Sequence, residues 1–126
     1  MTTTVLDTGA LIALERGAAS IRPYILLARQ ADTMLITSSA VVAQVWRGGS
    51  RQARLARFLA SDLVAELPLD PEAARQIGLL AATTGSKDVV DAHVALIALD
   101  HDAAVLTSDP DDIARWGVPA DRIVRC

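Results

Sequence analysis

Near its amino end the chain reads TTVLDTGALIALERG (residues 3–17), and this stretch is the clearest indication of the fold class. Its β-branched and apolar residues 3–6 predict a short strand that ends at Asp7. Residues 10–16 follow with leucine and isoleucine at helical spacing, and Gly17 is a typical helix stop. The stretch therefore predicts a strand that leads directly into a helix, with an acidic side chain at the junction.

The same alternation continues along the chain. Further strands are expected at residues 33–37, 63–67, 104–106 and 123–124, and further helices at 20–30, 40–46, 52–60, 71–83, 87–99 and 111–116. Asp70 and Pro71 form a strong helix start, and Ser86 is the expected cap of the helix that begins at Lys87. Strands that alternate with helices indicate an α/β fold, in which helices cover both faces of a mostly parallel sheet.

Composition restricts the class of protein. With 126 residues, of which 52% are hydrophobic, the chain fits one folded domain (residues 1–126) and excludes general disorder. The one cysteine, Cys126, cannot form an internal disulfide. The start of the chain is unlike a signal peptide, and the longest apolar run, residues 92–99, is far shorter than the ~20 residues of a membrane helix. We therefore expect a cytoplasmic protein without membrane contact.

Charge argues against one class of nucleic-acid binder. The net charge is −3, from 12 basic and 15 acidic residues, which disfavours a generally basic, sequence-tolerant binder. Lys87 is the only lysine, so 11 of the 12 bases are arginine, the better bidentate phosphate ligand; a general bias toward arginine would look the same. Aromatic residues are only 3% of the chain, too few for a stacking platform of several exposed rings, and we expect Trp46 in the core.

Acidic residues gather where the predicted strands end. Asp7 ends the first strand, Asp109 follows the fourth, and Asp88 and Asp91 open a helix. Ligands bind at this edge of parallel sheets. Clustered carboxylates repel one another unless a cation lies between them, and oxygen ligands select Mg²⁺ or Mn²⁺. Because zinc spacings such as CxxC are missing from the sequence, the pattern favours metal-assisted phosphodiester hydrolysis.

Each acid also has a simpler explanation. Asp7 could cap the first helix, Asp88 and Asp91 suit the positive end of a helix dipole, and Asp109 before Pro110 could form a turn. Because all of these acids fall at one predicted edge, we favour the site interpretation.

Four stretches follow one another along nearly the whole chain: VLDTGALIAL (5–14), VVAQVWRGG (41–49), DVVDAHVA (88–95) and VLTSDPDDI (105–113). In this order they resemble the PIN-domain family and, within it, the VapC toxins of bacterial toxin–antitoxin pairs. The resemblance implies a three-layer α/β/α sandwich with a central sheet of four to five strands. It also implies an endoribonuclease that needs Mg²⁺ or Mn²⁺, a homodimer, and a small antitoxin protein whose basic tail covers the acidic cleft.

The resemblance also assigns roles to residues. It implies metal ligands and catalytic acids at Asp7, Asp91 and Asp109, with Asp88 as an assisting catalytic acid and with Thr8, Thr107 and Asp112 near the metal. Gln44 stands where the family usually has glutamate, so we expect weaker metal binding unless Asp88 takes over part of that role. Alternatively, Gln44 only hydrogen-bonds a metal ligand, or the enzyme is weak or inactive.

Single residues bear on RNA contacts and on other possible functions. Arg47, Arg51 and Arg54 are candidates for RNA phosphate contacts, although they could equally form a solvated helix face. A haloacid-type phosphatase is excluded because Gly9 stands where that chemistry needs a second aspartate. The main alternative to a nuclease is a PIN fold kept as an interaction module that binds an antitoxin-like protein, and Gln44 supports it.

Overall fold

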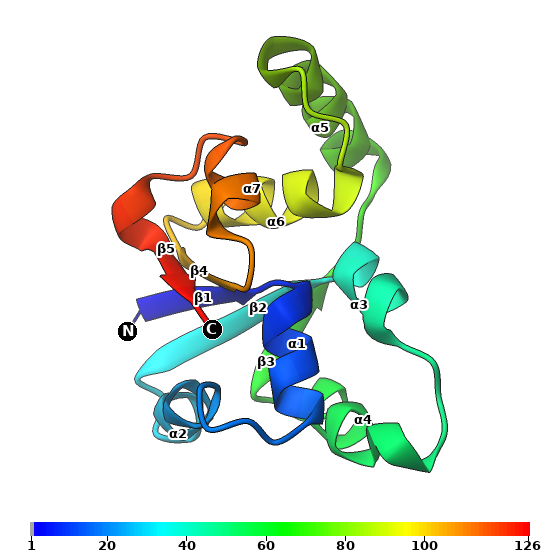
Figure 1. Cartoon of the computed structure of the whole chain (residues 1–126), viewed down its shortest axis with the longest axis vertical. Coiled ribbons are helices and arrows are strands. Elements are labelled where there is room, and N and C mark those ends of the chain that lie inside the picture. Colours follow the sequence, from blue (N-terminus) through cyan, green and yellow to red (C-terminus); the bar gives the residue numbers. More distant parts are fainter. Residues whose placement is uncertain (1) are drawn as a thin grey trace.

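The computed structural model describes residues 2–126 and contains a five-stranded, fully parallel sheet (Figure 1). Its strands are β1 (Thr2–Leu6), β2 (Thr33–Ser38), β3 (Val64–Leu67), β4 (Ala104–Thr107) and β5 (Ile123–Arg125). Their order in the sheet is β3-β2-β1-β4-β5. The prediction of a mostly parallel sheet of four to five strands is confirmed, and β1 is the central strand, between β2 and β4.

Residues 2–126 form seven α-helices: α1 (Thr8–Glu15), α2 (Arg22–Arg29), α3 (Ser39–Val45), α4 (Ala53–Leu59), α5 (Pro71–Thr84), α6 (Val89–Asp100) and α7 (Pro110–Ala114). Helices α1, α2 and α4 cover one face, and α6 covers the other (Figure 1). Helix α5 packs on α6 and projects away from the sheet. The predicted three-layer α/β/α sandwich is confirmed.

The starts of α5 and α6 show which helix caps can be predicted from the local sequence. Asp70 caps α5 as predicted, because its Oδ1 accepts a hydrogen bond from the Ala73 amide at 2.8 Å. Helix α6 begins later than predicted, at Val89 instead of Lys87, and its cap is Asp88 rather than Ser86. The Asp88 carboxylate accepts from the Asp91 amide at 3.0 Å, and a negative charge also suits the positive end of the helix.

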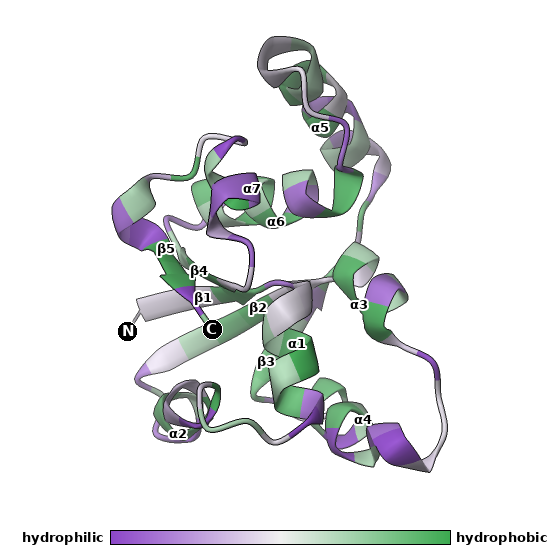
Figure 2. Cartoon of the chain, in the orientation of Figure 1, coloured by the Kyte–Doolittle hydropathy of each residue, from purple (hydrophilic) through white to green (hydrophobic). Residues whose placement is uncertain are grey.

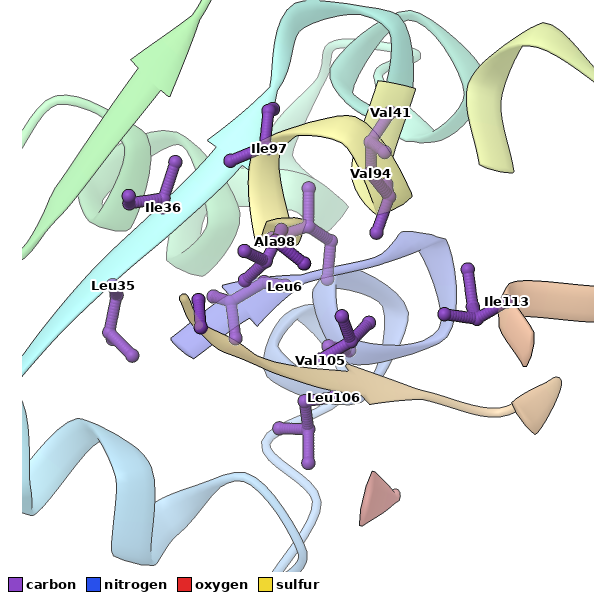
Figure 3. Packing of buried hydrophobic residues seen from close by; sticks show 14 of the residues in the cluster. Leu6, Leu35, Ile36, Val41, Val94, Ile97, Ala98, Val105, Leu106 and Ile113 are labelled. Atoms are coloured by element: carbon purple, nitrogen blue, oxygen red, sulfur yellow. The ribbon is translucent and has the colours of Figure 1, made fainter. Parts of the chain in front are cut away.

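The core lies around the central strands. Val5 and Leu6 of β1 and Val105 and Leu106 of β4 are essentially unexposed, and Figure 3 shows three of them (Leu6, Val105 and Leu106) with Val94 of α6 among the core side chains. Figure 2 shows apolar residues concentrated in the central strands and α1, whereas α7 is largely polar. The loops at the carboxyl ends of the strands are thus supported by a closely packed centre.

The expectation that Trp46 lies in the core is wrong. Trp46 is 42% exposed, whereas Trp116 is 1% exposed and belongs to the core. The reason is local, because α3 ends at Val45 and the backbone of Trp46 is already extended. Val41 and Val45, one helical turn apart, occupy the buried face of α3 instead.

None of the helices within residues 2–126 is both long and apolar enough to cross a membrane.

Candidate functional site

Asp7 lies at the carboxyl end of β1 and is only 3% exposed. Its Oδ1 accepts a hydrogen bond from the Thr8 amide at 2.7 Å, and its Oδ2 accepts one from the Thr107 hydroxyl at 2.8 Å. Burial raises the pKa of Asp7, while these two hydrogen bonds oppose the shift and the carboxylates of Asp109 and Asp88 add to it. Asp7 therefore caps α1 and is also held in one orientation at the edge of the sheet.

Of the neutral residues predicted near the metal, Thr107 contacts Asp7 through its hydroxyl group and Thr8 through its backbone amide. Thr8 and Thr107 make the hydrogen bonds just described, and the Thr107 hydroxyl also accepts one from the Asp109 amide at 3.0 Å. Gln44 reaches Asp7 only through Thr8, because its Oε1 accepts from the Thr8 hydroxyl at 2.6 Å. This series of hydrogen bonds connects β1, β4 and α3 around the buried carboxylate of Asp7.

Asp91 lies half-buried in the first turn of α6. Its pKa is raised from 3.8 to about 7, first by burial and then by the carboxylates of four other aspartates: Asp7, Asp88, Asp112 and Asp109. The structure therefore brings all five acids predicted from the sequence close enough together for the other four to raise the pKa of Asp91. Repulsion of this kind is relieved by a proton or by a bound cation.

The remaining acids differ in how they are held. Asp109 occupies the capping position of α7 but makes no capping hydrogen bond, so the turn explanation does not account for its carboxylate. Asp112 pairs with Arg115 at 3.2 Å on the surface. Within residues 2–126, no three His, Cys, Asp or Glu side chains form a ready-made metal-binding group. The carboxylate oxygens of these aspartates are the ligands that Mg²⁺ and Mn²⁺ prefer, and a bound cation would relieve the repulsion between their charges. The side chains do not form a preformed metal cage.

Sequence reasoning used Gly9 only to exclude a phosphatase and missed its role in the fold. A Cβ atom at this position would overlap the Ser108 side chain and come within 2.9 Å of the Ser108 backbone nitrogen. Glycine therefore lets the first turn of α1 lie directly against the loop that carries Asp109. The only sequence signal was the glycine itself, two residues after Asp7.

The three arginines predicted to bind RNA do not form one patch beside Asp7. Arg47 Nη1 donates to the Trp46 carbonyl at 2.8 Å, and Arg51 is exposed. Arg54 Nη1 donates to the Glu15 carbonyl at 3.1 Å, at the opposite end of α1 from Asp7. Their RNA contacts stay a prediction, and Arg54 is the least well placed of the three.

Arg54 instead lines a groove of about 630 Å³ between α1, α2 and α4. Its apolar side chains are Leu14, Ile21, Ile25, Leu26, Phe58 and Leu63, and its basic ones are Arg22, Arg29, Arg54 and Arg57. The molecule therefore has an acidic site at the end of the sheet and a separate, apolar groove bordered by arginines.

Comparison with known proteins places this geometry in a wider context. The family model of the PIN domain matches residues 4–117, and no curated protein sequence matches the chain significantly. The chain is similar in structure to one chain of VapBC2 from Rickettsia felis bound to a promoter DNA fragment, with a TM-score of 0.66, 15% identity and 98% of both chains covered. It is also similar to a chain of FitAB bound to an IR36 DNA fragment, with a TM-score of 0.56, 19% identity, and 97% of this chain and 94% of the other covered.

Proposed function

The chain belongs to the PIN domain family, whose members are generally nucleases, and from this premise we propose that it is an endoribonuclease that uses Mg²⁺ or Mn²⁺. The observation that carries the proposal is the crowding of Asp91 by four other carboxylates at the carboxyl edge of the sheet. Clustered acids of this kind have a use where a divalent cation and a phosphodiester are brought together.

We assign the cation to Asp7, Asp91 and Asp109, with Asp88 assisting. When bound, the cation supplies positive charge to the phosphodiester and activates water for hydrolysis. Asp7 offers a carboxylate whose orientation is fixed by Thr8 and Thr107. The pKa of Asp91 near 7 means that its carboxyl group holds a proton over much of the range below neutrality, so proton and cation compete for its oxygens.

Gln44 weakens this site in one respect and supports it in another. As an amide it brings no negative charge, but it holds the Thr8 hydroxyl at 2.6 Å and so supports the start of α1. Asp88 is close enough to raise the pKa of both Asp7 and Asp91, which supports the hypothesis that its charge replaces part of the missing glutamate.

RNA cleavage by the purified chain with Mg²⁺, with Mn²⁺ and with chelator tests the proposal. Asp7→Asn is the inactive comparison, and Asp62→Asn removes an exposed acid far from the site as a matched control. We expect metal-dependent cleavage by wild type and Asp62→Asn that Asp7→Asn abolishes. If folded wild type cuts neither structured nor unstructured RNA, the nuclease proposal fails. The second candidate, an interaction module with little catalysis, then stands; the uncharged Gln44 favours it.

We also propose a protein partner. The two similar structures are named as VapBC2 and FitAB complexes, which supports the toxin of a toxin–antitoxin pair with an antitoxin as the partner. The arginine-bordered groove between α1, α2 and α4 is suited to a helix with apolar and acidic side chains, and the acidic site to a basic segment. Together the two surfaces favour one partner with both segments.

A homodimer and a single cytoplasmic domain complete the proposal. Leu79 on the projecting helix α5 is 74% exposed, and Val89 at the start of α6 is 48% exposed. Exposed apolar side chains on the projecting helix α5 and at the start of α6 support an interface between two copies. The family model covers residues 4–117, which supports one domain over residues 1–126.

A further inference from the structure

The five aspartates of the acidic site attract a cation but repel the backbone of RNA. Their combined charge exceeds that of one divalent cation, so a phosphodiester that approaches the site still meets net repulsion. A basic side chain beside the cation would offset this repulsion. The three arginines expected to bind RNA form no patch beside Asp7, which leaves this role open.

Arg125 ends β5, the edge strand beside β4, and lies in the same row of the sheet as Asp7 (Figure 1). Thr107 pairs with Arg125 across β4 and β5. On the other side of β4, the Asp7 amide donates to the Leu106 carbonyl at 3.1 Å, which continues the pairing of β1 with β4 by one residue. Residues in one row of a sheet carry their side chains on the same face, and Thr107 uses this face to donate to Asp7 Oδ2 at 2.8 Å. Arg125 therefore extends from the face of the acidic site, two strands or about 10 Å from Asp7.

The guanidinium group of Arg125 is held at the loop that carries Asp109. Its Nη1 donates to the Ser108 carbonyl at 3.2 Å, and Arg125 and Asp109 line one polar cavity of about 210 Å³. Because the carbonyl is neutral, this hydrogen bond leaves the positive charge uncompensated and the other N–H groups available to a second acceptor. Arg115 lines the same cavity, but its charge is paired with the carboxylate of Asp112 at 3.2 Å. Of the two arginines in this cavity, Arg125 is therefore the better placed to bind an anion.

We propose that Arg125 binds a phosphate group of the RNA beside the cation, with Nε and Nη2 donating to its oxygens while Nη1 stays on the Ser108 carbonyl. This inference rests on the proposed nuclease function and adds a substrate-binding residue to that site. Arginine suits the role because its planar group can bind two phosphate oxygens at once.

The contact with Ser108 also suggests a purely structural role, in which Arg125 only steadies the loop of Asp109. The two roles predict different changes in cation affinity. Removal of a positive charge near the cation should leave its binding unchanged or make it tighter, whereas a loosened loop should weaken it.

The test measures RNA binding by the Asp7→Asn chain, which is expected to bind RNA without cutting it. The probe is a fluorescently labelled, unstructured RNA strand of about twelve nucleotides, followed by anisotropy at several salt concentrations. In this background Arg125→Gln should raise the Kd about tenfold and lower the slope of log Kd against log salt by about one. Arg125→Lys keeps the charge but loses the bidentate geometry, so it should keep the slope and raise the Kd less.

Arg75→Gln is the matched control. Arg75 is an exposed arginine on the projecting helix α5, and its Nη1 also donates to a backbone carbonyl, that of Pro71, at 3.2 Å. Its replacement should leave both the Kd and the salt slope unchanged, and circular dichroism should show that all variants fold.

Titration with Mn²⁺ in the otherwise wild-type chain separates the two roles of Arg125. Arg125→Gln should bind Mn²⁺ as tightly as wild type or more tightly. Weaker Mn²⁺ binding would assign Arg125 to the support of the Asp109 loop and overturn the proposal. An unchanged RNA Kd and salt slope in Arg125→Gln would also overturn it, while metal-dependent cleavage by wild type would keep the nuclease proposal intact. If wild type cuts no RNA and the Asp7→Asn chain binds none, both proposals fail together.

Discussion

The two sides of the acidic site are built in different ways. On the β1 side, Asp7 is buried and receives two hydrogen bonds, which fix its orientation and lower its pKa against the effect of burial. On the α6 side, Asp91 is half-buried, and burial together with four other carboxylates raises its pKa to about 7. The β1 side therefore holds a carboxylate in a fixed orientation, whereas the α6 side concentrates negative charge that a cation would neutralise.

The largest effect is expected from replacing Asp7, whose carboxylate is held in one orientation. Asp7→Asn should reduce RNA cleavage by more than about a hundredfold, since even loss of a residue behind a metal ligand can cost that much. Its melting temperature should be unchanged or higher, because a neutral amide of the same shape replaces a buried carboxylate whose pKa is raised. Cleavage rates and thermal melts by circular dichroism measure the two quantities. Wild-type cleavage by Asp7→Asn would mean that the β1 side is structural only.

The next effect concerns the charge on the α6 side and is seen in the pH dependence of stability. The folded-state pKa of Asp91, about 7, lies above its ordinary value of 3.8, so the folded chain binds this proton more tightly than the unfolded chain does. Without a divalent cation, the contribution of Asp91 to the free energy of unfolding should therefore be greatest below pH 4 and be lost as pH rises through about 7. Thermal melts should show this fall, Mn²⁺ should reverse it near pH 8, and Asp91→Asn should flatten it. An equal pH dependence in Asp91→Asn would assign it to other groups.

The sequence predicted the β1 side better than the α6 side, for a physical reason. Asp7, Thr107 and Asp109 directly end or follow strands, and the carboxyl ends of parallel strands necessarily meet at one edge. The cap of α6 was misplaced because Ser86 and Asp88 both suit the position, and the choice depends on how the charge meets the helix end.

Other features depended on contacts that no local pattern contains. Gly9 lies against Ser108, and residues 45–48 fold around Gln52. These contacts join segments that are brought together only when the chain is folded. Likewise, spacing along a helix does not reveal that Arg54 reaches the far end of α1. Trp46 was expected to be buried because it is apolar, but the end of α3 at Val45 leaves it at the surface.

A smaller effect is expected from Asp88→Asn, which removes one negative charge from the α6 side. Asparagine caps helices as well as aspartate does, so the hydrogen bond to the Asp91 amide and the stability of α6 should be kept while the charge is lost. Removing one negative charge at the partly exposed α6 side should weaken Mn²⁺ binding several-fold, on the order of 1 kcal/mol. Calorimetric titration with Mn²⁺ measures it, and Asp88→Ala, which should also lose about 1 kcal/mol of capping, is the comparison. Unchanged Mn²⁺ affinity in Asp88→Asn would end the hypothesis that Asp88 compensates for Gln44.

The smallest effect is expected from giving the β1 side a charge that it lacks. In Gln44→Glu the carboxylate can still accept from the Thr8 hydroxyl, so the link between α3 and α1 should survive. Mn²⁺ affinity should rise about two- to threefold, less than Asp88→Asn lowers it, because Gln44 reaches Asp7 only through Thr8. The decisive measurement is the double variant Asp88→Asn/Gln44→Glu: if the two charges serve the same cation, Gln44→Glu should restore more affinity there than it adds to wild type. Strictly additive effects would show that the charges act independently, and that the two sides of the site are not coupled through a shared cation.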